Sequence, residues 1–112
     1  MPAARQRVRP VDAAIIRLMT IAAKGATGQR MAREVEVIAS EWRRAPEHDP
    51  EEIAERLDEL FGQLAAAVED AEEGLADVDR SEPAAVKQAK AALDALVATR
   101  DAAQRAMLQF TL

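Results

Sequence analysis

The chain has 112 residues, of which 49% are hydrophobic, 31% charged and only 3% aromatic. Alanine alone supplies 26 residues, and Ala, Glu, Lys, Leu and Arg together supply 62, a composition typical of long helices and coiled coils. Four glycines, five prolines and few β-branched residues leave little from which to build a sheet. We therefore expect an all-α protein, with a basic arm over residues 1–9 and one helical domain over residues 10–112.

The net charge of −5 is divided unevenly along the chain. Residues 1–44 carry nine basic and four acidic side chains, a net charge of +5, whereas residues 45–112 carry six basic and sixteen acidic ones, a net charge of −10. A molecule polarised in this way can attract copies of itself head to tail, or offer its basic end to a polyanion.

The residue types available exclude several kinds of chemistry. There is no cysteine, so disulfides, zinc–thiolate sites and thiol nucleophiles are excluded. The single histidine, His48, has no second histidine with which to form a metal pair. No apolar stretch approaches the ~18 residues of a membrane span. We expect a soluble, cytoplasmic protein that is not an enzyme and binds no cofactor.

The first predicted helix covers residues 10–23. Pro10 suits a first-turn position, and Gly25 suits a left-handed cap after the last turn. A core-facing stripe passes through Ile15 and Leu18. Three further apolar residues lie beside this stripe: Ile16, Met19 and Ala23. Because the helix is apolar nearly all round, it should be largely buried or lie at an interface.

The second predicted helix covers residues 28–44 and is capped by Thr27. It carries the single stripe of an amphipathic helix, with 4-3-4 spacing: Met31, Val35, Ile38 and Trp42. The two helices are thus predicted to be short and joined by a tight turn over residues 24–27.

The longer helices are predicted over residues 50–79 and 83–110. Asp49 and Pro50 mark the start of the first of them, and Ser81 is a candidate cap for the second. Their apolar residues alternate at spacings of four and three, which is the pattern of coiled-coil packing. Since the break between them is short, we expect a long antiparallel hairpin, too long for the two N-terminal helices to cover.

Scarce bulky side chains suggest that this hairpin gains stability by associating with other copies or proteins. Arg100 occupies an otherwise apolar position of the seam, where it could fix register or reach a carboxylate on a neighbour. The interface candidates from this argument are Ile15, Leu18, Trp42, Leu57, Leu60, Leu64, Arg100 and Phe110.

An acidic motif opens the third predicted helix. Glu51, Glu52 and Glu55 spell E-E-x-x-E, which resembles the first half of the metal-binding pattern in all-α nucleotide pyrophosphohydrolases of the MazG type. The companion E-x-x-D of that family is missing from the following helix, and the glutamates flank Ile53 and Leu57 on the outer side. We interpret the motif as a solvated acidic helix start, which also suits the helix dipole.

The basic N-terminal half allows a different interpretation, a helix-turn-helix over residues 11–42 that places residues 28–33 in a major groove. The arm would then enter a minor groove. The candidate nucleic-acid contacts are Arg5, Arg7, Arg9, Arg30 and Arg33.

The sequence thus leaves two functions open. The first is a non-enzymatic helical assembly or adaptor protein, a homo-oligomeric subunit of a bacterial or phage complex whose partner is itself or another protein. The second is a small dimeric DNA-binding regulator that uses its basic N-terminal half.

Overall fold

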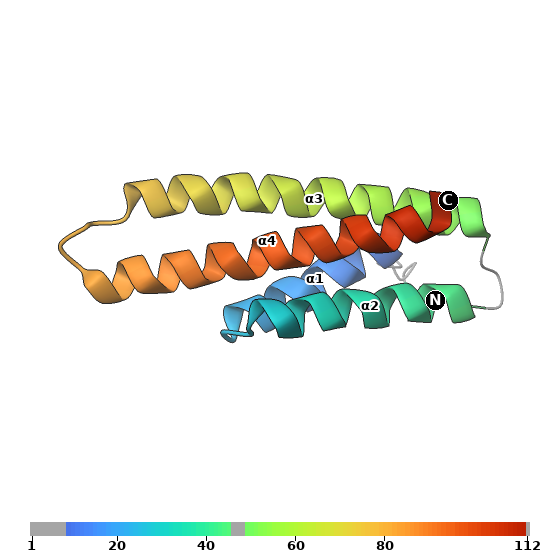
Figure 1. Cartoon of the computed structure of the whole chain (residues 1–112), viewed down its shortest axis with the longest axis horizontal. Helices are drawn as coiled ribbons and strands as arrows, with labels where there is room; N and C mark the ends of the chain where they lie inside the picture. The colour runs from blue at the N-terminus through green and yellow to red at the C-terminus, as the bar shows by residue number, and fades with distance from the viewer. Residues whose placement is uncertain (1–8, 46–48, 112) are drawn as a thin grey trace, which may run out of the picture.

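The protein is all-α. The computed structural model describes residues 9–45 and 49–111, with side chains as far as Gln109. Within these ranges the chain forms four helices and no strand: α1 (Pro10–Ala23), α2 (Gly28–Arg44), α3 (Pro50–Asp77) and α4 (Pro83–Thr111) (Figure 1). The bounds agree with those predicted, except that α3 ends two residues earlier and α4 one residue later. The early end follows from Val78, whose backbone is extended.

Local signals account for most of these ends. Gly25 has a φ of +82°, the left-handed conformation predicted after α1. The hydroxyl of Thr27 accepts a hydrogen bond from the Arg30 N–H at 3.2 Å, and Asp49 accepts one from the Glu51 N–H at 3.0 Å. Ser81, the candidate cap of α4, donates from both its N–H and its hydroxyl to the carboxylate of Asp79.

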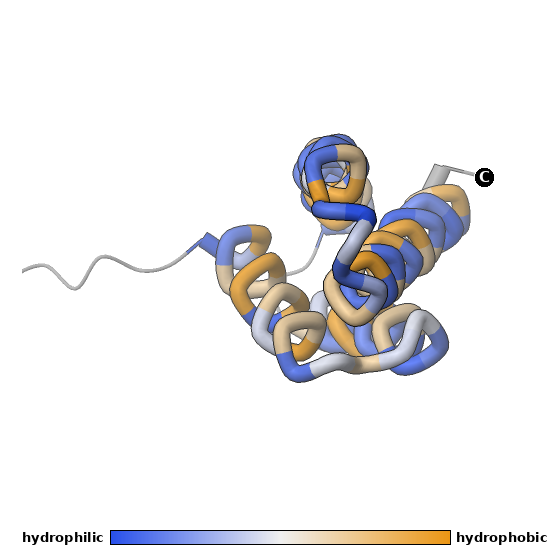
Figure 2. The backbone as a smooth tube through the Cα atoms, turned by 90° about the vertical axis from the view of Figure 1, so that its left-hand side faces the viewer, coloured by the Kyte–Doolittle hydropathy of each residue, from blue (hydrophilic) through white to orange (hydrophobic). Residues whose placement is uncertain are grey.

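The four helices occupy the corners of a bundle. Seen end-on, α3, α4, α2 and α1 follow one another around it, and consecutive helices of the chain run in opposite directions (Figures 1 and 2). The α3–α4 hairpin makes the largest helix–helix contact, and α2 packs mainly on α4. Consequently α2 and α3 lie at diagonal corners, and their outer faces point in opposite directions.

The core is built from one face of each helix. The largest fully buried side chains from α1, α2 and α3 are Leu18, Met31, Ile38, Ile53, Leu57, Leu60, Leu64 and Val35. On α4 the buried positions are mostly alanines, together with Thr99, whose hydroxyl donates to the Ala95 carbonyl at 2.6 Å. Small side chains on α4 allow its neighbours to approach closely, since a Cβ on Gly28 of α2 would lie 3.0 Å from the Ala98 Cβ.

The far end of the hairpin extends beyond α1 and α2 (Figure 1). No side chain from Glu69 to Asp94, a range described throughout, is fully buried; Leu75 and Leu93 are only half-buried. The prediction that the N-terminal helices cannot cover the whole hairpin is therefore confirmed for this tip. The seam through Leu57 and Leu64, in contrast, is covered by α1 and α2.

Candidate interaction surfaces

The four leucines predicted as interface residues lie in the core of a single chain. Leu18, Leu57, Leu60 and Leu64 are 0% exposed. The two short helices pack across the proximal half of the hairpin and bury its seam, so that these side chains are not available to another molecule. Their placement at an interface is wrong, because the sequence pattern shows that a face is apolar but not which helix covers it.

The remaining interface candidates lie in different places. Ile15 and Trp42 are half-buried and pack against the core, with the Arg56 guanidinium 6.0 Å from the centre of the indole ring. Arg100 is half-buried, and its guanidinium contacts the adjacent Asp101 at 3.2 Å, a partner within the same helix. The side chain of Phe110 lies outside the described residues.

An apolar face of α1 points away from the bundle. Ile16 is 60% exposed and Met19 41%, and Ala13 and Ala23 are exposed on the same side. Thr20, also exposed, lies between them, and its hydroxyl is satisfied within the helix because it donates to the Ile16 carbonyl at 2.7 Å. We call this set (Ala13, Ile16, Met19, Thr20 and Ala23) the α1 outer face. The apolar composition of residues 10–23 indicated that this helix could lie at an interface. The interface candidates taken from it, however, were Ile15 and Leu18, which do not belong to the α1 outer face.

An ion-pair network that the sequence predictions did not include joins α1 to α2. Arg17 Nε donates to Glu34 Oε1 at 2.5 Å, and its Nη1 lies 3.0 Å from Glu41 Oε2. Burial alone would lower the pKa of Arg17, but the hydrogen bonds to Glu41 and Glu34 outweigh it and raise that pKa. The sequence feature that indicates this network is the seven-residue spacing of Glu34 and Glu41, which places both carboxylates on one face of α2. The network fixes α1 with its outer face toward solvent.

The outer face of α3 is acidic. The carboxylates of its first turns lie outward, as predicted for the E-E-x-x-E motif, and Glu52 pairs with Arg56 at 2.7 Å. In the described residues, no group of three or more His, Cys, Asp or Glu could hold a metal ion. Further exposed carboxylates continue along the helix to its end: Asp58, Glu69, Asp70, Glu72, Glu73 and Asp77.

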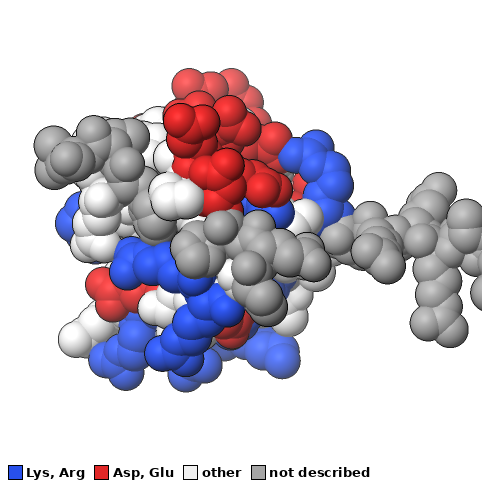
Figure 3. Space-filling model, turned by 90° about the vertical axis from the view of Figure 1, so that its right-hand side faces the viewer, with Lys and Arg blue, Asp and Glu red and all other residues white. Residues whose placement is uncertain are grey.

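The outer face of α2 is basic. Arg30, Arg33 and Arg44 are exposed, and none of them forms an ion pair with another residue of the described ranges. Val37, 39% exposed, lies between them along the helix. At the end of the molecule where α3 begins, carboxylates gather over α3, and most basic side chains lie toward α2 (Figure 3). The charge division of the sequence is therefore also a division in space.

The predicted nucleic-acid contacts are only partly available. Arg30 and Arg33 are exposed, as such contacts require. Arg9 instead pairs with Glu59 of α3, which raises the Arg9 pKa through a hydrogen bond and charge attraction. Arg5 and Arg7 lie outside the described residues. Helices α1 and α2 run alongside each other in opposite directions, whereas the helices of a helix-turn-helix cross steeply.

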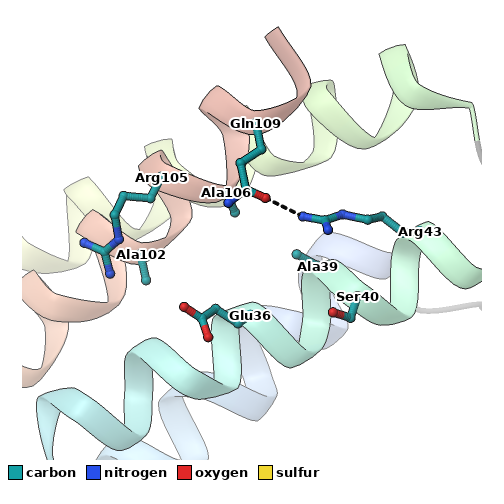
Figure 4. Close-up of a pocket in the computed structure, with 8 residues that line it drawn as sticks. All are labelled: Glu36, Ala39, Ser40, Arg43, Ala102, Arg105, Ala106 and Gln109. Carbon is teal, nitrogen blue, oxygen red and sulfur yellow. Dashed lines mark hydrogen bonds between the residues drawn. The ribbon is translucent and has the colours of Figure 1, made fainter. Parts of the chain in front are cut away.

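A small cleft lies between α2 and α4 (Figure 4). Its volume is about 270 Å³, below the usual range for small-molecule sites. Alanines form its floor, and Arg43 donates across it to Gln109 at 2.8 Å. Glu36 and Arg105 bring opposite charges to its rim. This bridged and mixed lining does not define a site for one class of ligand.

Comparison with known proteins adds no assignment, because the chain matches no protein-family model, no curated protein and no solved structure. None of the helices in the described ranges is long and apolar enough to cross a membrane.

Proposed function

We propose that this protein is a non-enzymatic helical assembly protein that acts through protein–protein contacts and forms a homo-oligomer. The observation that carries this proposal is the α1 outer face. The core of each chain already contains the large apolar side chains of α2 and α3, yet Ile16 and Met19 remain in water. Exposed apolar side chains grouped on one helix face are typical of surfaces that bind another protein.

The charge division supports the same function. Each copy carries a carboxylate face on α3 and an arginine face on α2, at diagonal corners of the bundle. Complementary faces of this kind orient partners and accelerate their encounter more than they raise affinity. In this proposal the apolar face supplies the affinity, and the charged faces restrict the orientations in which copies or other proteins approach.

Molar mass in solution tests this function. Sedimentation equilibrium of the full chain, from the low micromolar to the submillimolar range, should show a mass that rises above that of the 12.2 kDa monomer. A mass that stays monomeric across the whole range would contradict the homo-oligomer. Circular dichroism on the same samples should show a helical chain at every concentration, since the core does not depend on a partner.

A second candidate, a DNA-binding regulator, is favoured by one observation: Arg30, Arg33 and Arg44 are exposed along α2 and form no ion pair in the described residues. Guanidinium groups in a row along a helix are suited to phosphate contacts. Retardation of duplex DNA tests this function. Arg30→Ala combined with Arg33→Ala should weaken retardation, and a wild-type chain that leaves duplex DNA unshifted would remove this candidate.

A further inference from the structure

We propose that two copies of this chain pair through their α1 outer faces, with the two α1 helices antiparallel about a two-fold axis beside residue 18. This inference rests on the proposed function, since it specifies the surface and geometry of the self-association. In such an isologous contact the same patch serves both copies, so that each residue has one partner position on the other chain.

The α1 outer face offers an apolar surface with no unsatisfied polar atom in its middle. Ile16, the most exposed of its large side chains at 60%, lies near the centre, and the hydroxyl of Thr20 is bonded to its own helix. Ala13 and Ala23 lie at the two ends, where short side chains let two helix backbones approach closely. Around the proposed axis, Ile16 of one copy faces Thr20 of the other, and Ala13 faces Ala23.

Charges at the ends of α1 select the antiparallel orientation. Asp12 lies six residues before position 18, and Lys24 lies six residues after it. Neither forms an ion pair with another residue of the described ranges. An antiparallel pair brings Asp12 of each copy to Lys24 of the other, which makes two opposite-charge contacts. A parallel pair would place like charges together at both ends, which is destabilising.

The charges of Asp12 and Lys24 also indicate that the partner of the α1 outer face is a second copy of this chain. The face has one acidic and one basic side chain at opposite ends and apolar side chains between them, a pattern that is its own complement when rotated by half a turn. A strongly charged partner would have no electrostatic complementarity to this face, because its one acidic and one basic side chain cancel in charge. Because α1 is only about 21 Å long at 1.5 Å per residue, the contact belongs to the small interface class, and we expect dissociation in the micromolar range.

A pair of aspartate substitutions tests the surface. Ile16→Asp should give a monomer with wild-type helicity, because the side chain is already in water in the single chain. Val37→Asp is the matched control, an exposed apolar residue on α2 that the proposed contact does not include, and it should keep the wild-type mass. If Ile16→Asp self-associates as wild type does, the α1 contact is wrong while the assembly function stands. If wild type is itself monomeric, the proposed function has failed.

Disulfide trapping tests the orientation, and the natural chain has no cysteine to interfere. Asp12→Cys and Lys24→Cys are made as separate variants and oxidised alone and mixed. In an antiparallel pair, position 12 of one copy meets position 24 of the other, so only the mixture should form a disulfide-linked dimer. The mixed dimer also keeps one Asp12–Lys24 contact. Cross-linking of either variant alone would overturn the antiparallel geometry, as would the failure of the mixture while wild type is dimeric.

Discussion

Arg17 holds two short helices together through carboxylates that lie two turns apart on α2. Glu34 is mostly buried, with 11% of its side chain exposed, whereas Arg17 is 40% exposed. Removing the guanidinium leaves a carboxylate that has lost both water and its counter-charge. Replacing the carboxylate as well removes that penalty. The two residues should therefore depend on each other energetically.

We expect Arg17→Met to lower the free energy of unfolding by about 1–2 kcal/mol, a range reduced for the exposure of the arginine. The double variant with Glu34→Gln should lose less than the sum of the two single variants. Urea denaturation measures all four proteins. Arg33→Met, which removes an exposed arginine with no ion pair in the described residues, is the control and should change little. Additive losses would show that the pair is not coupled.

Asp79 organises the turn between α3 and α4. The backbone N–H and the hydroxyl of Ser81 donate to its carboxylate, and these hydrogen bonds lower the pKa of Asp79. Since the folded-state pKa lies below that of the unfolded chain, the turn is stabilised above the ordinary aspartate pKa. That stabilisation is lost as the pH falls through the lowered value.

Ser81→Ala keeps the backbone donor and removes the hydroxyl. We expect the pKa of Asp79 to rise toward its ordinary value in this variant, measured by the pH dependence of the carboxyl carbon resonance. Any difference in stability between Ser81→Ala and wild type should disappear at a pH below both pKa values. An unchanged titration of Asp79 would contradict the role assigned to the Ser81 hydroxyl.

At the scale of the helix, two glycines have opposite surroundings. Gly62 lies inside α3 with nothing within 4 Å of an added Cβ, whereas Gly28 opens α2 against Ala98 of α4. Gly62→Ala should raise the free energy of unfolding by about 1 kcal/mol through helix propensity alone. Gly28→Ala should show no such gain, because its methyl group would force α2 away from α4. Thermal denaturation compares them, and equal stabilisation would contradict the close approach of these helices.

The two halves of the α3–α4 hairpin should differ in their sensitivity to truncation. Leu64 is fully buried beneath the N-terminal helices, whereas Leu75 lies in the uncovered tip. Leu64→Ala should cost about 2–5 kcal/mol, as large-to-small changes in a packed core do. Leu75→Ala should cost less than half as much, since water already reaches that side chain. Equal losses in chemical denaturation would mean that the tip is packed as tightly as the proximal half.

The elements could be predicted from sequence because their ends depend on neighbouring residues. Pro10, Gly25, Thr27 and Asp49 act within one helical turn, and the structure places each where the prediction did. The packing of α1 and α2 over Leu64 could not be predicted from such local features. It depends on which helix packs on which, and residues far apart in the chain decide that. An amphipathic pattern reports a buried face equally well for a neighbour in the same chain and for one in another.

Because a sequence pattern does not show which elements pack together, the surface features could be predicted only in part. The apolar excess of α1 indicated either burial or an interface, and the structure shows that Leu18 is buried while Ile16 is exposed. The partners of Arg17, on the following helix, were not foreseen. The expectation that Arg100 fixes register or reaches a carboxylate on a neighbour rested on its seam position alone, and the ion pair that it forms is with Asp101 of the same helix.

At the scale of the whole molecule, the net charge of −5 opposes association while the division of charge favours it. At physiological ionic strength the Debye length is about 8 Å, far shorter than the hairpin, which is about 42 Å long for the 28 residues of α3. Repulsion between whole copies is therefore largely screened, and contacts at the interface decide whether the copies associate. An apolar contact and a phosphate contact then respond differently to added salt.

Self-association through the α1 outer face should change by no more than about threefold in dissociation constant between about 50 and about 200 mM salt, because screening weakens both the overall repulsion and the two end contacts. Binding of duplex DNA through Arg30, Arg33 and Arg44 of α2 should weaken by about 40-fold over that range, from a slope of about −0.9 for each phosphate contact. Sedimentation equilibrium and fluorescence anisotropy measure the two constants, and Arg33→Ala should reduce the DNA slope by about one without changing the mass. An oligomer that dissociates as steeply as a DNA complex would show that the charged faces of α2 and α3, rather than Ile16 and Met19, hold the copies together.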